Sequence, residues 1–403
     1  MRALLEASFR AAVGAADPLR ILPPQLPAPP AGRTYVAAAG KAAASMALAV
    51  ERAWPRTAAL EGVALTRYGH GLPTQRIRVL EAGHPVPDAA GEQGARAILE
   101  GVRALGPQDL LLALVSGGGS SLLSLPAPGV AMDALKAMTR ELLRCGAPIQ
   151  EINTVRKHLS AIQGGRLAAA SRAPVLALIV SDVVGDDPTN IASGPCAPDP
   201  TSIADAQAIL GRYGIPAPGP FSETPKPGDA IFARVENRVV AAARRSLEAA
   251  AAVFAAEGIA PVVLGDDITG EARVVALDMA RRARSMQRPS VLISGGECTV
   301  TVRGAGGRGG RCAEFLLALA LALEGAPGIH AIAADTDGID GSEDNAGAVM
   351  APDSLARAAA KGLDARAQLD ANDSYGFFSA LGDLVVTGPT RTNVNDYRAI
   401  VVA

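Results

Sequence analysis

Short apolar runs alternate with longer amphipathic segments along most of the chain. An unbroken apolar run is typical of a strand buried on both faces, and a 3.6-residue repeat is typical of a helix packed on a sheet. This pattern predicts strands at Thr34–Ala39, Asp109–Val115, Val175–Val180, Ala260–Leu264, Ser290–Ile293 and His330–Ala334. It predicts helices at Lys41–Arg52, Met132–Cys145, Asn153–Ser171, Val239–Glu257, Ala272–Ser285 and Arg311–Leu323. Such alternation indicates an α/β fold with a doubly wound, mostly parallel sheet.

Two domains are expected, because 403 residues exceed what one hydrophobic core usually holds. The segment 215–228 is rich in Pro and Gly and is the predicted linker, so the domains are expected at 1–222 and 229–403. The first should be Rossmann-like. The second should be smaller with a mixed sheet, because Cys298–Gly304 alternates polar and apolar residues like a half-exposed antiparallel strand. The tail has two strand-like pieces around Gly388–Asp396, and packing on the first domain is one alternative for them.

Composition narrows the class of protein. Apolar residues make up 49% of the chain, aromatic residues only 3%, and the net charge is −2, so neither a basic stripe nor a stacking surface for nucleic acid is present. Four cysteines without CxxC spacing fit a reducing compartment. The longest apolar run, Phe315–Leu323, is too short to span a bilayer. We therefore expect a cytoplasmic protein with no nucleic-acid and no membrane partner.

Glycine-rich turns follow two of the predicted strands, as VSGGGSS at 115–121 and ISGGE at 293–297. Glycine lets the backbone approach a ligand and direct several N–H groups at one anion. The predicted phosphate- or nucleotide-binding residues are Ser116, Gly117, Gly118, Gly119, Ser120, Ser121, Ser294, Gly295, Gly296 and Glu297. Gly40 and Lys41 lie at a strand–helix junction, where a helix N-terminus favours an anion and a lysine adds a cation. A solvated helix start is an equal alternative for Lys41.

A third glycine cluster, 304–310, adds Arg308 and Arg311, whose side chains suit phosphate oxygens. The same segment satisfies GxGxxG and has Asp335 after the next strand, which is similar to a dinucleotide fingerprint. The preceding segment alternates in polarity, and this argues against a buried strand leading into a dinucleotide site.

Two acidic loops follow apolar strands, and ligands gather at the carboxyl ends of strands in open parallel sheets. The candidate Mg²⁺ ligands are Asp182, Asp186, Asp187, Asp335 and Asp337. Aspartate also favours turns and caps, which is the structural alternative. The helix that carries Asn153, Arg156 and Lys157 is either a solvated face or a clamp for the carboxylate of a small acid.

Together these segments resemble the glycerate 2-kinases of the MOFRL type. The matching segments are AAGKAAASM, GHPVPDAAG, LVSGGGSSLLSLP, INTVRKHLSAIQGGRLA, SDVVGDDPTNIASGP, LISGGECTVTV, GGRGGRCAEF, ADTDGIDG and VVTGPTRTNVND, in the order of the family. One departure is clear, since Cys312 and Ala313 replace the usual Asn-Gln pair.

The resemblance implies two α/β domains with the active site in the cleft between them. It implies transfer of the γ-phosphoryl group of ATP to the 2-hydroxyl of D-glycerate, giving 2-phosphoglycerate, with Mg²⁺ or another divalent cation. Lys41 and Arg311 would act at the reacting phosphate, and Asp182 would be a base or a metal-side carboxylate. An NAD(P)-dependent hydroxypyruvate reductase and a non-enzymatic binder of a phosphorylated metabolite are the alternatives. The oligomeric state stays open, with a homodimer among the possibilities.

Overall fold

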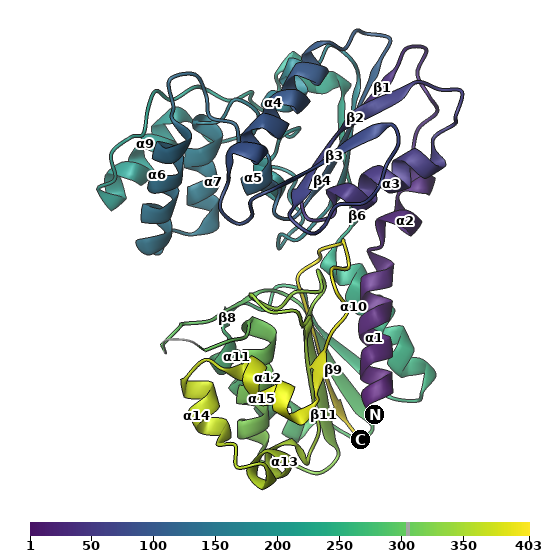
Figure 1. Ribbon diagram of the computed structural model, residues 1–403, viewed down its shortest axis with the longest axis vertical. Coiled ribbons are helices and arrows are strands. Elements are labelled where there is room, and N and C mark those ends of the chain that lie inside the picture. The colour runs from purple at the N-terminus through teal and green to yellow at the C-terminus, as the bar shows by residue number, and fades with distance from the viewer. Residues whose placement is uncertain (304–306) are drawn as a thin grey trace. The chain divides into compact units, whose positions relative to one another are not determined.

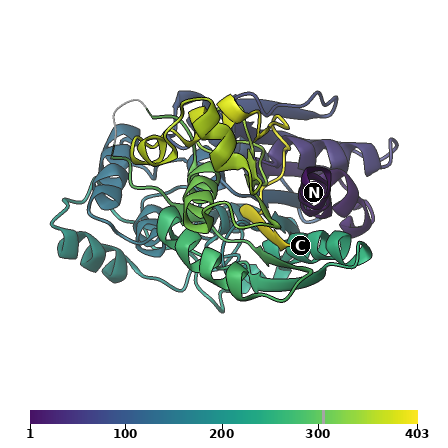
Figure 2. The same ribbon diagram turned by 90° about the horizontal axis from the view of Figure 1, so that it is seen from below.

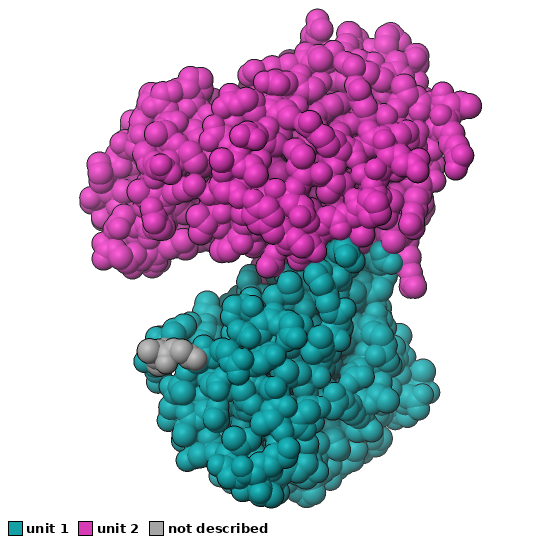
Figure 3. Space-filling view, in the orientation of Figure 1, with its two compact units in different colours: residues 1–17, 241–403 teal, residues 18–240 magenta. Residues whose placement is uncertain are grey.

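The computed structural model describes residues 1–303 and 307–403, and they form two compact units. Unit 2 comprises Pro18–Val240, and unit 1 comprises Met1–Asp17 together with Ala241–Ala403 (Figure 3). The boundary therefore lies after Val240, and not in the Pro- and Gly-rich segment 215–228. That segment is itself tied to unit 2, since the Ser222 N–H donates to the carbonyl oxygen of His158 at 2.9 Å.

Unit 2 is built on one six-stranded sheet. Its strands are β1 (Thr34–Ala39), β2 (Leu60–Arg67), β3 (Ile77–Ala82), β4 (Leu110–Ser116), β5 (Val175–Val180) and β6 (Val235–Ala241), in the order β3-β2-β1-β4-β5-β6. Neighbouring strands from β3 to β5 are parallel, and β1 to β4 of this sheet are labelled in Figure 1. The chain runs outward from β1 to β3 and then returns to place β4 on the other side of β1. The sheet is thus doubly wound, as predicted, with its switch point between β1 and β4.

Helices connect these strands. They are α2 (Pro18–Ile21), η1 (Pro23–Gln25), α3 (Ala43–Ala53), α4 (Ala89–Arg103), α5 (Gly119–Leu122), α6 (Met132–Arg144), α7 (Ile149–His158), α8 (Arg166–Ala170), η2 (Ile191–Ser193), α9 (Ile203–Tyr213) and η3 (Ala230–Arg234). Every residue of β1, β4 and β5 is buried, which explains why these strands read as unbroken apolar runs.

Unit 1 contains the mixed sheet expected of the second domain. Its strands are β7 (Ala260–Gly265), β9 (Ser290–Ser294), β11 (Ile329–Asp335), β12 (Gly347–Met350), β13 (Leu384–Val385) and β14 (Asp396–Val402), in the order β13-β12-β11-β14-β9-β7. Only β7 and β9 pair in parallel among these strands. The tail strands thus belong to this sheet, and β14 lies between β11 and β9.

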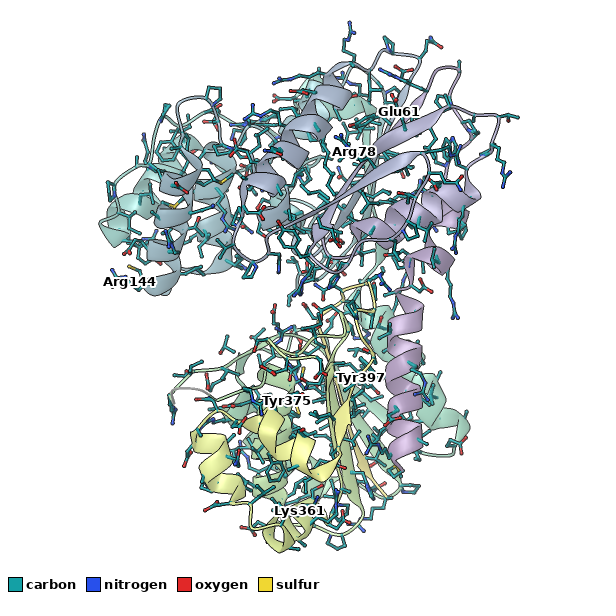
Figure 4. All side chains as sticks on the ribbon, viewed as in Figure 1. Glu61, Arg78, Arg144, Lys361, Tyr375 and Tyr397 are labelled. Atoms are coloured by element: carbon teal, nitrogen blue, oxygen red, sulfur yellow. The ribbon has the colours of Figure 1, made fainter. Side chains whose placement is uncertain are left out.

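The helices of unit 1 are α1 (Arg2–Ala15), α10 (Ala243–Ala256), α11 (Ala272–Ser285), α12 (Arg311–Leu323), α13 (Ser354–Ala360), α14 (Ala365–Asp370) and α15 (Ser374–Leu381). Helix α1 packs on α10 and β14. Phe9 stacks on Tyr397 with ring centroids 6.0 Å apart, and the Tyr397 hydroxyl lies 2.8 Å from the Ser8 hydroxyl (Figure 4). The start and the end of the chain therefore lie close together in one unit (Figure 2).

Three local predictions are wrong. Of the antiparallel strand expected at 298–304, the structure describes residues 298–303, and these hold only β10 (Cys298–Thr299), which pairs in parallel with β8 (Gly270–Glu271). Further along, the Thr301 N–H donates to the Glu271 carboxylate at 3.0 Å, so a side chain replaces the strand partner. The helix expected at 153–171 is divided into α7 and α8, because Gly164 and Gly165 adopt left-handed backbone conformations. The helix expected from Val239 begins only after β6.

Across the described residues, no helix combines the length and the apolar character needed to cross a membrane.

Candidate functional site

The turns after β1 and β4 meet at the switch point of the unit 2 sheet. Ala39 at the end of β1 is level with Val115 near the end of β4. The N–H of Lys41 donates to the carbonyl oxygen of Gly117 at 2.8 Å, and the N–H of Ala42 donates to the Ser116 hydroxyl at 3.0 Å. The structure thus brings together two motifs that were predicted separately. Ligands of doubly wound folds bind at this position, outside the carboxyl ends of the strands.

Two glycines make this close approach of the turns possible. Gly40 has φ +131°, and a Cβ atom there would lie 2.1 Å from the Ser116 hydroxyl oxygen. Gly118 has φ +78°, and its Cβ would lie 2.8 Å from His84 Nε2 and 3.2 Å from Lys41 Cγ. A side chain at Gly40 would push the two turns apart, and one at Gly118 would displace the side chains of His84 and Lys41. His84 was not among the predicted site residues, because its GHPVPD segment indicated only a turn.

A chain of polar side chains supports the turn after β4. The hydroxyl groups of Ser120 and Ser193 are 2.9 Å apart, and the Ser193 hydroxyl donates to Asn153 Oδ1 at 3.3 Å. Gln163 Nε2 donates to the carbonyl oxygens of Ser120, at 2.8 Å, and Leu123, at 3.1 Å. Asn153 was expected to bind a substrate, but in the structure its side chain accepts a hydrogen bond from Ser193 within this supporting chain.

The loop after β5 brings its first aspartate to the same edge of the sheet. Val180 is level with Ser116, and Asp182 follows two residues later. Asp187 has a local partner set instead, since its carboxylate accepts from the Thr189 N–H at 2.9 Å, the Thr189 hydroxyl at 2.7 Å and Asn190 Nδ2 at 3.1 Å. Asp182 therefore lies at the end of the strand, whereas Asp187 stabilises the turn in which it lies.

Backbone strain is concentrated in this loop. Asp186, Ala192 and Ser193 have φ values of 54°, 51° and 59°, in the left-handed region that non-glycine residues rarely adopt. Each such residue costs on the order of 1–3 kcal/mol, and strained residues of this kind cluster at functional sites. The methyl group of Ala192 lies where a Cβ on Gly119 would come within 2.5 Å, so the strained segment packs against the glycine turn.

The aspartates of this loop have the carboxylate chemistry that a divalent cation requires. Among residues 1–303 and 307–403, no group of three His, Cys, Asp or Glu side chains is arranged to hold a metal ion. Mg²⁺ is usually bound through one or two carboxylates plus the phosphate oxygens of a substrate. Asp182 and Asp186 have the chemistry for that role, and the oxygens of Asp187 accept hydrogen bonds from its own turn.

The neighbours Arg156 and Lys157 on α7 have different surroundings. Lys157 Nζ lies 3.4 Å from Asp199 Oδ1, and both side chains are buried. Burial lowers the pKa of Lys157, and the charge of Asp199 opposes this shift. Lys157 is thus part of an internal ion pair and does not fit the predicted role of a substrate clamp. Arg156 instead lines a pocket of about 130 Å³ beside Ser120.

In unit 1, three carboxylates meet at one edge of the mixed sheet. Asp335 at the end of β11 is level with Asp396 at the start of β14, and Ser294 at the end of β9 is level with Arg398. Arg311, the first residue of α12, contacts three carboxylates. Its Nε and one terminal nitrogen lie 2.7 Å from Asp396 and Asp335, and its other terminal nitrogen lies 3.3 Å from Glu297.

These contacts give Arg311 a fixed orientation. Burial lowers the pKa of its guanidinium, but Asp396 and Asp335 outweigh this effect and raise the pKa well above its ordinary value. The second oxygen of Asp396 lies 2.7 Å from the buried side chain of Arg398, which also donates to the carbonyl oxygen of Gly295 at 2.9 Å. The turn Ser294–Glu297, predicted to bind phosphate, is therefore built into an internal ion network.

The remaining predicted residues of unit 1 lie in turns or at the surface. The Asp337 N–H donates to Asp335 Oδ1 at 3.1 Å, and Asp337 Oδ1 accepts from the Ile339 N–H at 2.9 Å. Arg308 lies over the ring of Tyr375, 4.9 Å from its centroid. Gly304 and Gly306 of the GxGxxG segment lie outside the described residues.

The substituted pair Cys312–Ala313 is buried at the first turn of α12. Their N–H groups donate to the two carboxylate oxygens of Asp340, at 3.0 and 2.8 Å. Burial raises the pKa of Asp340 to about 6, and these two hydrogen bonds oppose the shift. The contacts found here use the backbone of residues 312 and 313, so they do not depend on the departure from the family pattern.

Comparison with known proteins gives consistent matches over the whole chain. Residues 4–222 match a family described as a domain of unknown function, DUF4147, and residues 290–396 match the MOFRL family. A protein of Agrobacterium vitis provisionally named a hydroxypyruvate reductase is 52% identical, over 100% of this chain and 94% of its own. A glycerate 2-kinase of Pyrococcus horikoshii is 38% identical, over 92% of this chain and 87% of its own. The crystal structure of a glycerate kinase from Thermotoga maritima has a TM-score of 0.88 at 36% identity, covering 100% of this chain and 99% of the other.

Proposed function

Since the chain belongs to the MOFRL-type glycerate kinase family, we propose that it transfers the γ-phosphoryl group of ATP to the 2-hydroxyl of D-glycerate. The products are 2-phosphoglycerate and ADP, and a divalent cation accompanies the nucleotide. The hydrogen bond between the Lys41 N–H and the Gly117 carbonyl oxygen is the observation that carries the proposal, because it joins two phosphate-type turns at the sheet's switch point.

Phosphoryl transfer depends on positioning and on neutralising charge more than on covalent chemistry. The turn at Ser116–Ser121 would hold phosphate oxygens through backbone N–H groups and hydroxyls. Lys41 would neutralise charge on the transferring group, and Asp182 would act as the base for the acceptor hydroxyl or as a carboxylate beside the cation. When bound, the cation supplies charge neutralisation at the phosphates.

Arg311 is proposed to act on the transferring phosphoryl group from a pre-set position. The carboxylates of Asp335 and Asp396, each 2.7 Å from the guanidinium, fix its plane. A donor that is already oriented need not reorganise during the reaction. The same carboxylates neutralise part of its charge, so its contribution should be smaller than that of Lys41.

The reductase alternative has weaker geometric support. A dinucleotide fingerprint needs a buried strand that leads into GxGxxG and then a helix. Here the segment before Gly304 holds only the two-residue strand β10, which pairs with β8 outside the main sheet. The reductase alternative is nevertheless assayed below, because the Agrobacterium vitis relative is provisionally named a hydroxypyruvate reductase.

Two assays on the same purified protein test the proposal. One follows ADP release from MgATP and D-glycerate and identifies the product by ³¹P NMR, which separates 2-phosphoglycerate from the 3-isomer. The other follows NADH or NADPH oxidation with hydroxypyruvate. We expect phosphoryl transfer that stops when the cation is chelated, and no comparable hydride transfer. The Lys41→Met variant, purified in parallel, controls for contaminating kinases. ATP binding without turnover would favour the non-enzymatic alternative, and turnover of the reduced nucleotide would favour the reductase.

A further inference from the structure

The pocket beside Ser120 combines apolar walls with an excess of positive charge. It lies entirely within unit 2 and encloses about 130 Å³. The loop after β3 contributes Pro85, Val86 and Pro87, and α6 contributes Met132, Leu135 and Leu143. The polar part of the lining contains Lys136, Arg140, Arg156 and Ser120. Such a lining suits a ligand with one flat apolar part and one anionic part.

The cations of this pocket are poorly compensated within the protein. Among the described residues, neither Arg156 nor Arg140 makes an ion pair. The polar contact of Arg156 is a long one, 3.5 Å from its Nε to the Thr139 hydroxyl, and burial lowers its pKa. Lys136 is 3.9 Å from the fully exposed Asp133. Arg156 is partly buried and Arg140 is exposed, so an anion in this pocket would meet guanidinium groups that no carboxylate of the described residues neutralises.

Apolar side chains of the pocket walls are exposed to solvent, and a bound ligand would cover them. Val86 and Leu143 are each 60% exposed, and both line this pocket. The volume is close to the roughly 150 Å³ of an engineered apolar cavity that accepts benzene. It therefore suits one aromatic ring system. D-glycerate has a hydroxyl or carboxylate on each carbon and no apolar face to place against these side chains.

We propose that this pocket binds the base of the nucleotide, with the phosphates passing Arg156 toward the Ser116–Ser121 turn. This inference rests on the proposed kinase function. Ser120 belongs both to the pocket lining and to that turn, which makes the two sites continuous. Arg156 is thereby assigned to the nucleotide and not to the carboxylate of the acceptor, the role that the sequence suggested.

Calorimetric titration of ADP and of adenosine tests the assignment. Leu143→Glu places a negative charge on the apolar wall and should weaken ADP binding about tenfold or more, in the range that loss of a small apolar contact produces. Ile149→Glu is the matched control, because Ile149 is 53% exposed on α7 and does not line the pocket. It should bind ADP like the unmodified protein. Arg156→Met should weaken ADP binding and leave adenosine binding unchanged. Thermal melting of each variant confirms folding.

The outcomes separate this proposal from the kinase proposal. Unchanged ADP affinity in Leu143→Glu, or no ADP binding by the unmodified protein, overturns the pocket assignment. A rise in the KM for D-glycerate at constant ADP affinity also overturns it and makes the pocket the acceptor site. A protein that binds ADP through this pocket but does not phosphorylate D-glycerate contradicts the proposed function and leaves the pocket assignment intact. If Leu143→Glu phosphorylates D-glycerate with normal ATP kinetics, the pocket assignment is contradicted and the proposed kinase function stands.

Discussion

The N–H of Lys41 donates a 2.8 Å hydrogen bond to the carbonyl oxygen of Gly117, which joins the turn after β1 to the turn after β4. The two residues are far apart in sequence, and they meet because β1 and β4 are parallel neighbours. The backbone of Lys41 is therefore positioned by the same glycine turn that is proposed to hold the phosphates. Changes in that turn should alter catalysis through Lys41 as well as through the turn itself.

A methyl group on Gly118 should lower activity more than it lowers stability. In Gly118→Ala, the left-handed backbone costs roughly 1–2 kcal/mol. The new Cβ also meets His84 Nε2 at 2.8 Å and Lys41 Cγ at 3.2 Å, so it displaces these two side chains. We expect kcat to fall by about 10²-fold, as for small misplacements of catalytic groups. Gly146→Ala is a matched control, since Gly146 has φ +74° and nothing within 4 Å of the added carbon. Equal kinetics in the two variants would contradict the assignment.

Removal of the Lys41 ammonium should affect chemistry more than binding of the acceptor. We expect Lys41→Met to lower kcat by about 10²–10³-fold, the effect of losing one oriented donor, with a smaller change in the KM for D-glycerate. Lys361→Met removes an exposed lysine from α13's C-terminal turn and should leave both constants unchanged. Steady-state kinetics decide the matter. A Lys41→Met enzyme with normal kcat would return Lys41 to the role of a solvated helix-start lysine.

Asp182 and Asp187 should respond differently to the same substitution. Asp182→Asn should lower kcat by about 10²–10⁴-fold with a normal melting temperature, as expected for a general base. Asp187→Asn weakens hydrogen bonds to Thr189 and Asn190 and should destabilise unit 2 by about 1 kcal/mol. Urea unfolding and kinetics on both variants separate the roles. If the pattern is reversed, the catalytic carboxylate is Asp187.

Arg311 should contribute strongly to the stability of unit 1. In Arg311→Met, the buried carboxylates of Asp335 and Asp396 lose the guanidinium that lies 2.7 Å from each. Breaking such a pair from one side costs about 3–5 kcal/mol. Arg311→Lys should recover only part of the loss, because an ammonium cannot contact both carboxylates in the plane of the guanidinium. Chemical denaturation measures the free energies. A stable, inactive Arg311→Met protein would show a purely catalytic role.

Asp340 should make the protein less stable as the pH rises from about 4 to about 6. Burial raises the pKa of Asp340 from 3.8 to about 6, so the folded state binds the proton more tightly than the unfolded state. The corresponding stability is fully present below pH 3.8 and is lost as the pH passes about 6, a change of about 3 kcal/mol. Asp340→Asn should remove this dependence. Urea unfolding of both proteins at several pH values provides the comparison, and parallel pH profiles would refute the assignment.

The sequence predicts helix and strand bounds best where an element is well buried. Strands β1 and β5 and helices α11 and α12 have the predicted bounds, because their surroundings allow only one pattern. The end of strand β6, residues 239–241, falls within the predicted helix, because β6 is partly exposed at the edge of its sheet and has mixed polarity. Local patterns carry little information about such edges.

The site was predicted less completely, for two physical reasons. The glycine turns and Lys41 are local signals, and their meeting follows from the strand order. The partners of Arg311 come from β11 and β14, whose pairing joins Asp335 to Asp396 across a long sequence separation that no periodicity reveals. Arg156 and Lys157 are consecutive, yet a helix rotates each residue by about 100° from the last, so one lines a pocket and the other an internal ion pair.

The division of unit 1 between the start and the end of the chain has a consequence for synthesis on the ribosome. Helix α1 is translated before all of unit 2, whereas its partner β14 is translated last of the strands. The apolar face of α1, including Phe9, therefore cannot contact β14 until all of unit 2 has been translated. Because β14 lies between β9 and β11, the sheet of unit 1 cannot close until translation has passed residue 402. A nascent chain halted before that point would expose the part of α1 that contacts β14, and two unpaired strand edges, to chaperones and proteases.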